Sequence, residues 1–345
     1  MTNTMHGKHA FLPNRRKFAR PYRVVIHGLS HFCQKLAALL DCEGWDVRFH
    51  SHSTAADLLS LANDLRRCDL AYTWGGRIDL GKFLWAARFL GPRKLVMLWS
   101  GSDALWAKKD HAAGKTHRWV ASKTHWAVSP WIADEVRSVG LSCEYVQASF
   151  VQRVKKPLPL PARFSVLAYF PSADKAQLYG WDQIVEAAKA LPSIEFRIVG
   201  MRGDETLQAP ENVKIQGWTQ ELAVVLQESC ILWRPVQHDG LSFMVLEALA
   251  QGRHVLYSYP LPGCVNVKSA SLAILELKRL ACLHEKQNLE LNRAGLEVVE
   301  REFSEEVVRK NLLSRWEKII LSSCRPSNGK TAGEATPEVA QRQSI

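Results

Sequence analysis

The chain has 345 residues, 47% of them hydrophobic and 23% charged, and a formal net charge of +11. This composition is ordinary for a soluble globular protein, and the length predicts two domains rather than one core. No apolar run is long enough to cross a bilayer, and the first residues lack the apolar segment of a secretory signal. We therefore expect a cytoplasmic protein, with contact at the inner face of the membrane as an option.

The two ends of the chain differ in composition from the rest. Residues 1–22 form a basic arm without acidic residues, for which we predict a disordered, solvated segment. Contact of this arm with an anionic membrane surface or an acidic partner is the alternative. Residues 322–345 are rich in Ser, Gly, Thr, Pro and Gln and predict a disordered tail.

A first Rossmann-like domain is expected at residues 23–157, where short apolar runs alternate with segments of helical period. The first run ends at Gly28, after which Leu36, Leu39 and Leu40 recur at helical spacing. Further strands are predicted at 45–49, 68–73, 94–98, 126–128 and 144–148, and helices at 55–65 and 80–89. This order predicts a parallel sheet with helices on both faces.

A second domain of the same type is expected at residues 158–303, after a linker that contains three prolines between residues 155 and 161. Its strands are predicted at 165–170, 195–199, 213–216, 230–234 and 254–258, and its helices at 181–191, 222–227 and 243–250. The expected fold is therefore α/β, with two Rossmann-like domains facing a cleft.

A last helix is expected at residues 304–321. Four apolar side chains recur in it at four-residue spacing, which predicts packing along one apolar stripe; they are Val308, Leu312, Trp316 and Ile320.

The most informative motif lies between residues 234 and 255, where a strand end, a glycine turn and a helix start follow one another. Ser242 is a candidate N-cap, and the amides of residues 240–243 would point out of the helix toward a phosphate. Gly240 would let the backbone approach closely. Glu247 could accept hydrogen bonds from a vicinal diol such as a ribose.

The alternative for this motif is a plain capped helix. Asp239 would then complement the helix dipole, and Glu247 would be a surface charge. The apolar neighbours of Glu247 argue against this alternative, because a solvated carboxylate would interrupt a nearly all-apolar helix and a buried one needs a partner.

The spacing from Asp239 to Glu247, followed by residues 248–255, resembles the carboxylate motif of family 4 retaining glycosyltransferases, which have the GT-B fold. The resemblance covers residues 164 to about 265 and includes the stretches 179–182, 196–200, 213–218 and 262–263. In the N-terminal half it rests on Gly28, which would lie on the acceptor side, and on residues 99–103 and 126–129.

The resemblance implies a nucleotide-sugar as donor and a glycan or lipid-linked glycan as acceptor, without a further cofactor. It implies that Glu247 binds the ribose hydroxyls and Asp239 the hydroxyls of the sugar. The backbone amides of Gly240, Leu241 and Ser242 would hold the sugar and diphosphate. Trp218, after Gly217, would stack on the base, with simple core filling as the alternative.

The sequence departs from the family pattern where positive charge is expected. Members usually have Glu at the position of Asp239, and an Arg and a Lys that face the diphosphate. Here Tyr169 lies in the strand end, and Tyr179 stands where the Lys is expected. Three cations are candidates for the diphosphate instead: Lys175, Arg202 and Arg234. If none serves, the protein is a degenerate relative that binds the donor without turnover.

Asp103 follows the strand predicted at 94–98, at an edge where such sheets bind ligands. It could orient the acceptor hydroxyl as a catalytic residue, or it could cap the helix that follows. The basic stretch 108–118 could face an anionic acceptor, although a solvated loop is the default prediction. Trp106 and Trp119 could stack on sugars, enter a membrane interface or belong to the core.

No metal site is expected, because the sequence has no D-x-D pair and its eight cysteines lack metal-ligand spacing. Residues 76–82 fit a phosphate-binding P-loop up to Lys82, but Phe83 replaces the Ser or Thr that would bind Mg²⁺. The basic charge would suit a nucleic-acid-binding module, yet no zinc finger or basic helix is present, so no nucleic-acid partner is expected.

Overall fold

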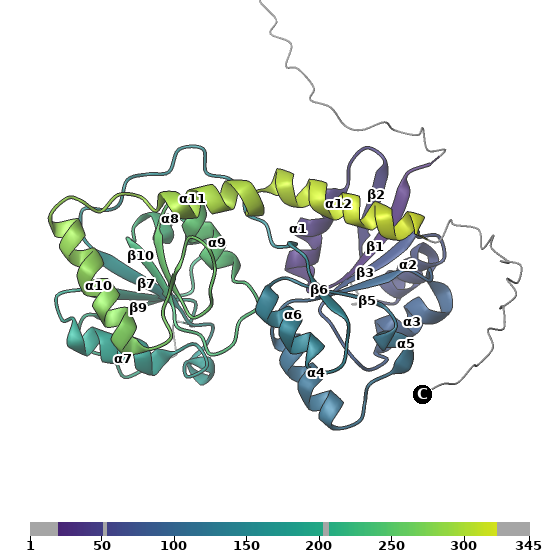
Figure 1. The fold of residues 1–345 in the computed structure, drawn as a ribbon, viewed down its shortest axis with the longest axis horizontal. Helices are drawn as coiled ribbons and strands as arrows, with labels where there is room; N and C mark the ends of the chain where they lie inside the picture. Colours follow the sequence, from purple (N-terminus) through teal and green to yellow (C-terminus); the bar gives the residue numbers. More distant parts are fainter. Residues whose placement is uncertain (1–19, 51–53, 203–206, 323–345) are drawn as a thin grey trace, which may run out of the picture.

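The computed structural model describes residues 20–50, 54–202 and 207–322 (Figure 1). Nearly all of the predicted basic arm and C-terminal tail lies outside these residues. Within them, the chain forms two parallel sheets of six strands each, interleaved with helices. The predicted α/β fold with two Rossmann-like halves is therefore confirmed.

The first sheet has the strand order β2-β1-β3-β4-β5-β6, and every neighbouring pair is parallel. Its strands β3 and β4 are buried at every residue, as expected for a parallel sheet covered on both faces. The strands are β1 (Tyr22–Gly28), β2 (Trp45–Phe49), β3 (Leu70–Trp74), β4 (Leu95–Trp99), β5 (Thr124–Ala127) and β6 (Cys143–Tyr145). The helices are α1 (Ser30–Leu40), α2 (Ala55–Leu65), α3 (Lys82–Leu90), α4 (Ser102–Ala112), α5 (Arg118–Ala121) and α6 (Pro130–Arg137).

The second sheet has the order β12-β11-β10-β7-β8-β9 and is also parallel throughout. Its strands are β7 (Ser165–Tyr169), β8 (Glu195–Val199), β9 (Val213–Gly217), β10 (Ile231–Arg234), β11 (His254–Tyr257) and β12 (Val265–Asn266). Its helices include α7 (Trp181–Ala190), α8 (Leu222–Gln227), α9 (Phe243–Ala250), α10 (Ala270–Glu285) and α11 (Arg293–Val298). The strand order reverses between β7 and β10, and such a switch point opens a crevice at the carboxyl ends of the strands.

The prediction of a solvated loop at residues 108–118 is wrong in its first part, because α4 continues to Ala112. Ala, Leu and Lys are strong helix formers. Asp103 in the first turn and Lys109 and His111 in the last turn complement the helix dipole. Its apolar residues do not recur on one face of the helix, so apolar periodicity did not predict it.

The chain crosses between the two halves twice. The first crossing includes residues 155–161, which form neither helix nor strand. The fully buried Arg253 holds this segment by donating to the carbonyls of Leu158 (2.7 Å) and Pro159 (3.2 Å). The second crossing leads into α12 (Glu305–Leu321), and the two crossing segments are bridged between Val151 and Ser304. Among the described residues, no helix is long and apolar enough to span a membrane.

Helix α12 leaves the C-terminal half and lies over the N-terminal half, next to α1 and the first sheet (Figure 1). Its predicted apolar stripe is buried in full: Val308, Leu312, Trp316 and Ile320. The ring of Trp316 lies 5.2 Å from the ring of Tyr72 and 6.0 Å from that of Trp45. The last helix of the chain therefore completes the core of the first half.

Replacing Trp316 by alanine would leave a large cavity between α12 and the first sheet. We expect the Trp316→Ala variant to lose about 3–5 kcal/mol in the free energy of unfolding of the N-terminal half, measured by thermal and urea unfolding. Leu321→Ala, at a 44% exposed position of the same helix, is the control and should change stability by less than about 0.5 kcal/mol. Equal stability of the two variants would contradict the packing of α12 described above.

Candidate functional site

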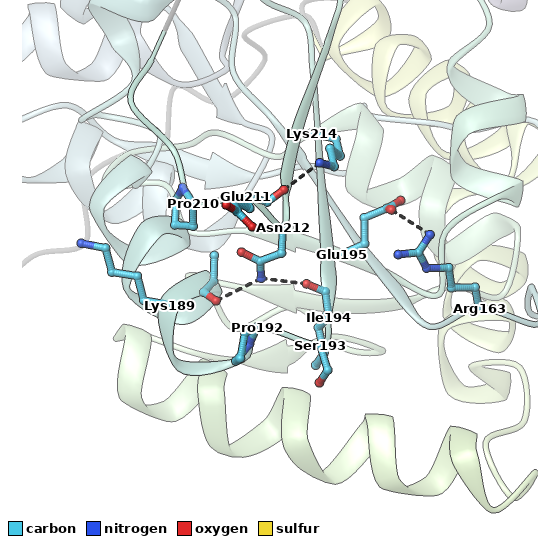
Figure 2. A pocket seen from close by; sticks show the side chains of 11 residues that line it. Arg163, Lys189, Pro192, Ser193, Ile194, Glu195, Pro210, Glu211, Asn212 and Lys214 are labelled. Carbon is cyan, nitrogen blue, oxygen red and sulfur yellow. Dashed lines mark hydrogen bonds and ion pairs between the residues drawn. The ribbon is translucent and has the colours of Figure 1, made fainter.

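Two cavities in the C-terminal half lie at opposite edges of the second sheet. The cavity in Figure 2, about 410 Å³, lies at the amino ends of β8 and β9. Several of its polar groups bond to one another or to the backbone: Arg163 pairs with Glu195 at 3.1 Å, and the Asn212 amide donates to three backbone carbonyls, those of Ala188, Leu191 and Ile194. Parallel sheets bind ligands at the opposite edge. This cavity is therefore not the candidate site.

The second cavity, about 280 Å³, lies at the carboxyl ends of β7 to β10 and includes the switch point of the sheet. Four of the residues singled out from the sequence line it: Trp218, Arg234, Ser242 and Glu247. The others are Tyr169, Val199, Gly200, Thr219, Leu222, Phe243, Met244 and, from the N-terminal half, His31. We call this space the donor cavity.

Glu247 is the only lining residue of the donor cavity that carries a carboxylate. Six apolar residues of its helix α9 are buried and anchor the helix in the core. The Glu247 side chain is therefore held in the wall of the cavity rather than in bulk water. Burial raises the pKa of Glu247, and the positive charge of Lys35 opposes part of that rise. In the described part of the chain we find no hydrogen bond or ion pair to this carboxylate, so its oxygens are available to a bound ligand.

The amino end of α9 opens onto the donor cavity. Ser242 is its N-cap in extended geometry, as predicted, but the Ser242 hydroxyl makes no capping hydrogen bond. Ser242, Phe243 and Met244 all line the cavity. The first amides of a helix have no partner within the helix, and together with the helix dipole they favour an anion.

Trp218 lies at the rim of the donor cavity with 68% of its surface exposed. The alternative that it fills a core is therefore wrong. It follows Gly217, which ends β9 with a φ of 77° that a residue with a side chain rarely adopts. An exposed indole at a cavity rim offers an aromatic face to a ligand.

Arg234 and Asp239 form a buried ion pair at the end of β10, with 2.6 Å between Nε and Oδ2. The Tyr257 hydroxyl donates to the same Oδ2 at 3.0 Å. Burial lowers the pKa of Arg234, but the charge of Asp239 and its hydrogen bond outweigh burial, so the net shift is upward. The guanidinium carbon lies 5.2 Å from the ring centroid of Tyr179 and 6.0 Å from that of Tyr169.

This arrangement separates the three cations that the sequence left open. Arg234 lines the donor cavity beside the two tyrosines found where the resemblance implied cations. Lys175, at the end of the short 3₁₀ helix Ala173–Lys175, and Arg202 are both exposed, and neither lines the cavity. The geometry therefore favours Arg234.

Asp103 is buried, and its carboxylate accepts hydrogen bonds from four backbone amides: Gly76 (2.8 Å), Ser100 (3.0 Å), Gly101 (2.7 Å) and Ala104 (3.0 Å). Burial raises the pKa of Asp103, and these amide bonds oppose the rise. The carboxylate does not line the donor cavity. The N-cap of α4 is Gly101 and Asp103 lies in the first turn of the helix, so the prediction of Asp103 as the N-cap is wrong. Its four amide partners instead favour a role in fixing the loops around the start of α4 over a catalytic role.

The P-loop alternative at residues 76–82 does not fit the structure. The Gly76 amide is bonded to Asp103, and a side chain at Gly76 would collide with the ring of Trp99. A phosphate would need that amide to be free.

Gly28 is required by the close approach of two strands. A Cβ at this residue would lie 2.0 Å from the carbonyl oxygen of Trp74, so glycine lets β1 and β3 meet at the switch point of the first sheet. Gly28 does not line the donor cavity, but His31, three residues later, does. His31 was not among the site residues predicted from the sequence. Its position in the first turn of the helix that follows Gly28 was the available signal.

The two halves meet beside the site, where helix α6 of the first half contacts the segment that follows β10. The Trp131 indole donates to the Asp239 carbonyl at 2.7 Å and stacks on Tyr259, while His238 contacts Glu135 at 3.0 Å. Burial raises the pKa of Glu135, but His238 and Lys108 outweigh it and the net shift is downward. Backbone also meets backbone: a Cβ at Gly240 would lie 1.6 Å from the carbonyl oxygen of Ser100. The structure thus shows the cleft with its two sides in contact.

Across the described residues, no cluster of three or more His, Cys, Asp or Glu side chains is arranged to hold a metal ion.

No protein-family model and no curated protein matches this sequence. Solved structures are similar in fold. The sucrose-phosphate synthase of Thermosynechococcus elongatus superposes with a TM-score of 0.64 at 13% identity, covering 88% of this chain and 100% of that one. HepE of Anabaena, in complex with UDP and glucose, gives a TM-score of 0.60 at 11% identity, with coverage of 86% and 100%. TarM gives 0.55 at 11% identity over 76% of this chain, which spans 58% of the length of TarM. The chain therefore has the GT-B fold of glycosyltransferases.

The contact at Gly240 can be tested by adding a single methyl group. In Gly240→Ala the new Cβ would overlap a backbone oxygen, so we expect the two halves to separate and the radius of gyration, measured by small-angle X-ray scattering, to increase. Gly114→Ala is the control for the steric effect, since a Cβ at this glycine meets nothing within 4 Å. Gly114 has a φ of 70°, so any backbone strain in this variant is confined to the end of α4. Identical scattering from wild type and Gly240→Ala would contradict a closed cleft in solution.

Proposed function

We propose that this protein is a retaining glycosyltransferase that moves a sugar from a nucleotide-sugar to a glycan or lipid-linked glycan without a metal ion. The observation that carries the proposal is the half-buried carboxylate of Glu247, which has no hydrogen-bond or ion-pair partner among the described residues and lies in a cavity at the switch point of a GT-B fold. The complex of the similar protein HepE with UDP and glucose supports a nucleotide-sugar as the donor.

In this proposal each wall of the donor cavity binds one part of the donor. Glu247 accepts hydrogen bonds from the ribose hydroxyls, and the exposed face of Trp218 stacks on the base. The amides at the start of α9 and the guanidinium of Arg234 hold the diphosphate. His31 approaches from the N-terminal half and contacts the donor on the acceptor side.

Asp239 has a second function in the proposal. The two side-chain hydrogen bonds found for its carboxylate in the described residues both use Oδ2, which leaves Oδ1 as an acceptor for the hydroxyls of the sugar. The pair with Arg234 and Tyr257 fixes the orientation of that oxygen. Asp239 does not itself line the donor cavity, but it is paired with Arg234, which does. In the proposal Asp239 positions the sugar from beside the cavity, while the charge of Arg234 is directed at the leaving group.

During transfer, the bond between the anomeric carbon and the diphosphate oxygen breaks and a bond to the acceptor oxygen forms. The acceptor proton leaves with the diphosphate, so atoms and charge balance. Negative charge accumulates on the departing diphosphate, and preorganised positive groups lower the barrier by stabilising it. In this chain those groups are Arg234 and the amino end of α9.

A second candidate function is donor binding without turnover. The observation that favours it is the ion pair itself, because the charge of Arg234 is already partly neutralised by Asp239. Release of labelled sugar from the bound nucleotide-sugar, in the presence of glycan acceptors, separates the two. A transferase consumes the donor, whereas a binding protein returns it intact.

The donor site can be tested by calorimetry with UDP, GDP, ADP and their sugar conjugates. We expect one nucleotide to bind, and Glu247→Gln to weaken it about tenfold to a hundredfold through loss of a charge-assisted hydrogen bond. Glu186→Gln, at an exposed position of α7, is the matched control and should bind like wild type. Absence of binding for all nucleotides would overturn the proposed function.

The pH dependence of nucleotide affinity gives a separate test of Glu247. The ionised carboxylate accepts both ribose hydrogen bonds, so affinity is complete above the pKa of Glu247 and falls as the pH drops through it. Because burial raises this pKa, the loss should begin at a higher pH than an ordinary glutamate would give. Glu247→Gln, measured alongside, should lack this component. Parallel pH profiles of the two proteins would exclude Glu247 from the site.

A further inference from the structure

Helices α2, α3 and α5 cover one face of the first sheet, on the side of the N-terminal half that faces away from the C-terminal half (Figure 1). Their inner sides share one buried cluster, which includes Leu61, Phe83 and Val120. We call the outer sides of these three helices the α2–α3–α5 surface. It is separate from the donor cavity, none of whose lining residues it contains.

Large apolar side chains are exposed together on this surface. Trp85 and Phe89 lie one turn apart on α3, 55% and 60% exposed, with their ring centroids 4.9 Å apart. Leu58 and Leu59 on α2, which packs against α3, are 53% and 74% exposed. Clustered exposure of this kind marks a surface that is covered by a partner.

The charges on α3, α5 and the segments beside them have one sign. The sequence contains no acidic residue between Asp79 and Asp103 or between Asp110 and Asp134, the two stretches that supply α3 and α5. The cations within them include Lys82, Arg88, Arg93, Arg118 and Lys123.

Two of these cations make cation–π contacts with aromatic rings. Arg88 lies over the ring of Phe89 at 5.4 Å, and Lys123 over that of Trp119 at 4.6 Å. The acidic residues of α2 are already engaged: Asp57 closes a capping box, and Asp64 pairs with Arg48 and His50. The cations of α3, α5 and the segments beside them outnumber Asp57 and Asp64. The α2–α3–α5 surface therefore combines exposed apolar groups with a net positive charge.

This combination selects the partner. A second copy of the chain docked face to face would bring like charges together, which disfavours association. An anionic lipid surface satisfies both features, because aromatic and leucine side chains enter the headgroup boundary while Lys and Arg contact the phosphates. We propose that the α2–α3–α5 surface docks the protein on an anionic bilayer, with Trp85 and Phe89 inserted.

The proposal goes beyond glycosyl transfer and does not depend on it. Docked in this way, the N-terminal half would rest on the lipid and the donor cavity would remain open to solvent.

The test is co-sedimentation of the full chain with vesicles of phosphatidylcholine alone and of phosphatidylcholine mixed with phosphatidylglycerol. We expect binding to the mixed vesicles only, weakened by salt. The double variant Trp85→Ser/Phe89→Ser should bind at least about tenfold more weakly, because two buried aromatic side chains are lost. Arg88→Gln should bind about fivefold more weakly, the effect of one cation near an anionic surface.

Trp106→Ser is the matched control. Trp106 is 67% exposed, more than Trp85, but lies on α4, which packs with α6 and belongs to a different buried cluster. It should bind like wild type. All variants should keep the nucleotide affinity of wild type, which separates failure of the membrane proposal from failure of the donor site.

Two outcomes would overturn the proposal. Vesicle binding that persists in the Trp85→Ser/Phe89→Ser variant would place the membrane contact elsewhere on the chain. A dimer in lipid-free buffer, detected by sedimentation velocity and dissociated by the same double variant, would assign the surface to a second copy of the chain.

Discussion

The buried ion pair between Arg234 and Asp239 is the interaction around which the rest of the site is arranged. It ties the carboxyl end of a central strand, β10, to the loop that leads into α9. The same Asp239 accepts a hydrogen bond from Trp131 of the N-terminal half through its backbone carbonyl. One pair of residues thus fixes a strand end, the approach to a helix terminus and a contact across the cleft.

A buried pair of this kind is a constraint on position more than a large source of stability. Desolvation of both ions offsets most of their attraction, whereas removal of one partner would leave an uncompensated charge in the interior. In the proposed transfer reaction this constraint has a chemical use, because it holds the Arg234 cation for the diphosphate and the Asp239 carboxylate for the sugar. It also reduces the net charge offered to the diphosphate, which is why binding without turnover stays a serious alternative.

The two halves of the molecule are joined by more than the cleft. The chain crosses twice, and the buried Trp316 makes α12 part of the first core although the helix follows the second domain in sequence. The halves are therefore joined both by the contacts at the cleft and by the two crossing segments with α12. Backbone contact at Gly240, where no side chain fits, shows how closely the two sheet edges approach. Motion between the halves would have to break the contacts at Trp131 and His238 first.

Local pattern was sufficient for every described strand except β12 and for seven of the twelve described α-helices, α9 among them, because parallel strands are continuous apolar runs and helices of this fold bury one stripe. It missed α4, α5, α6, α10 and α11. Glu247 could also be recognised from local pattern, because it is a carboxylate inside an otherwise apolar helix. Side chains whose role depends on a partner distant in sequence could not be assigned in this way. Only the tertiary structure separated Arg234 from Lys175 and Arg202, gave Asp103 four amide partners, brought His31 to the donor cavity and placed α12 on the first sheet. Each depends on which elements meet in space, and periodicity along a chain carries no information about that.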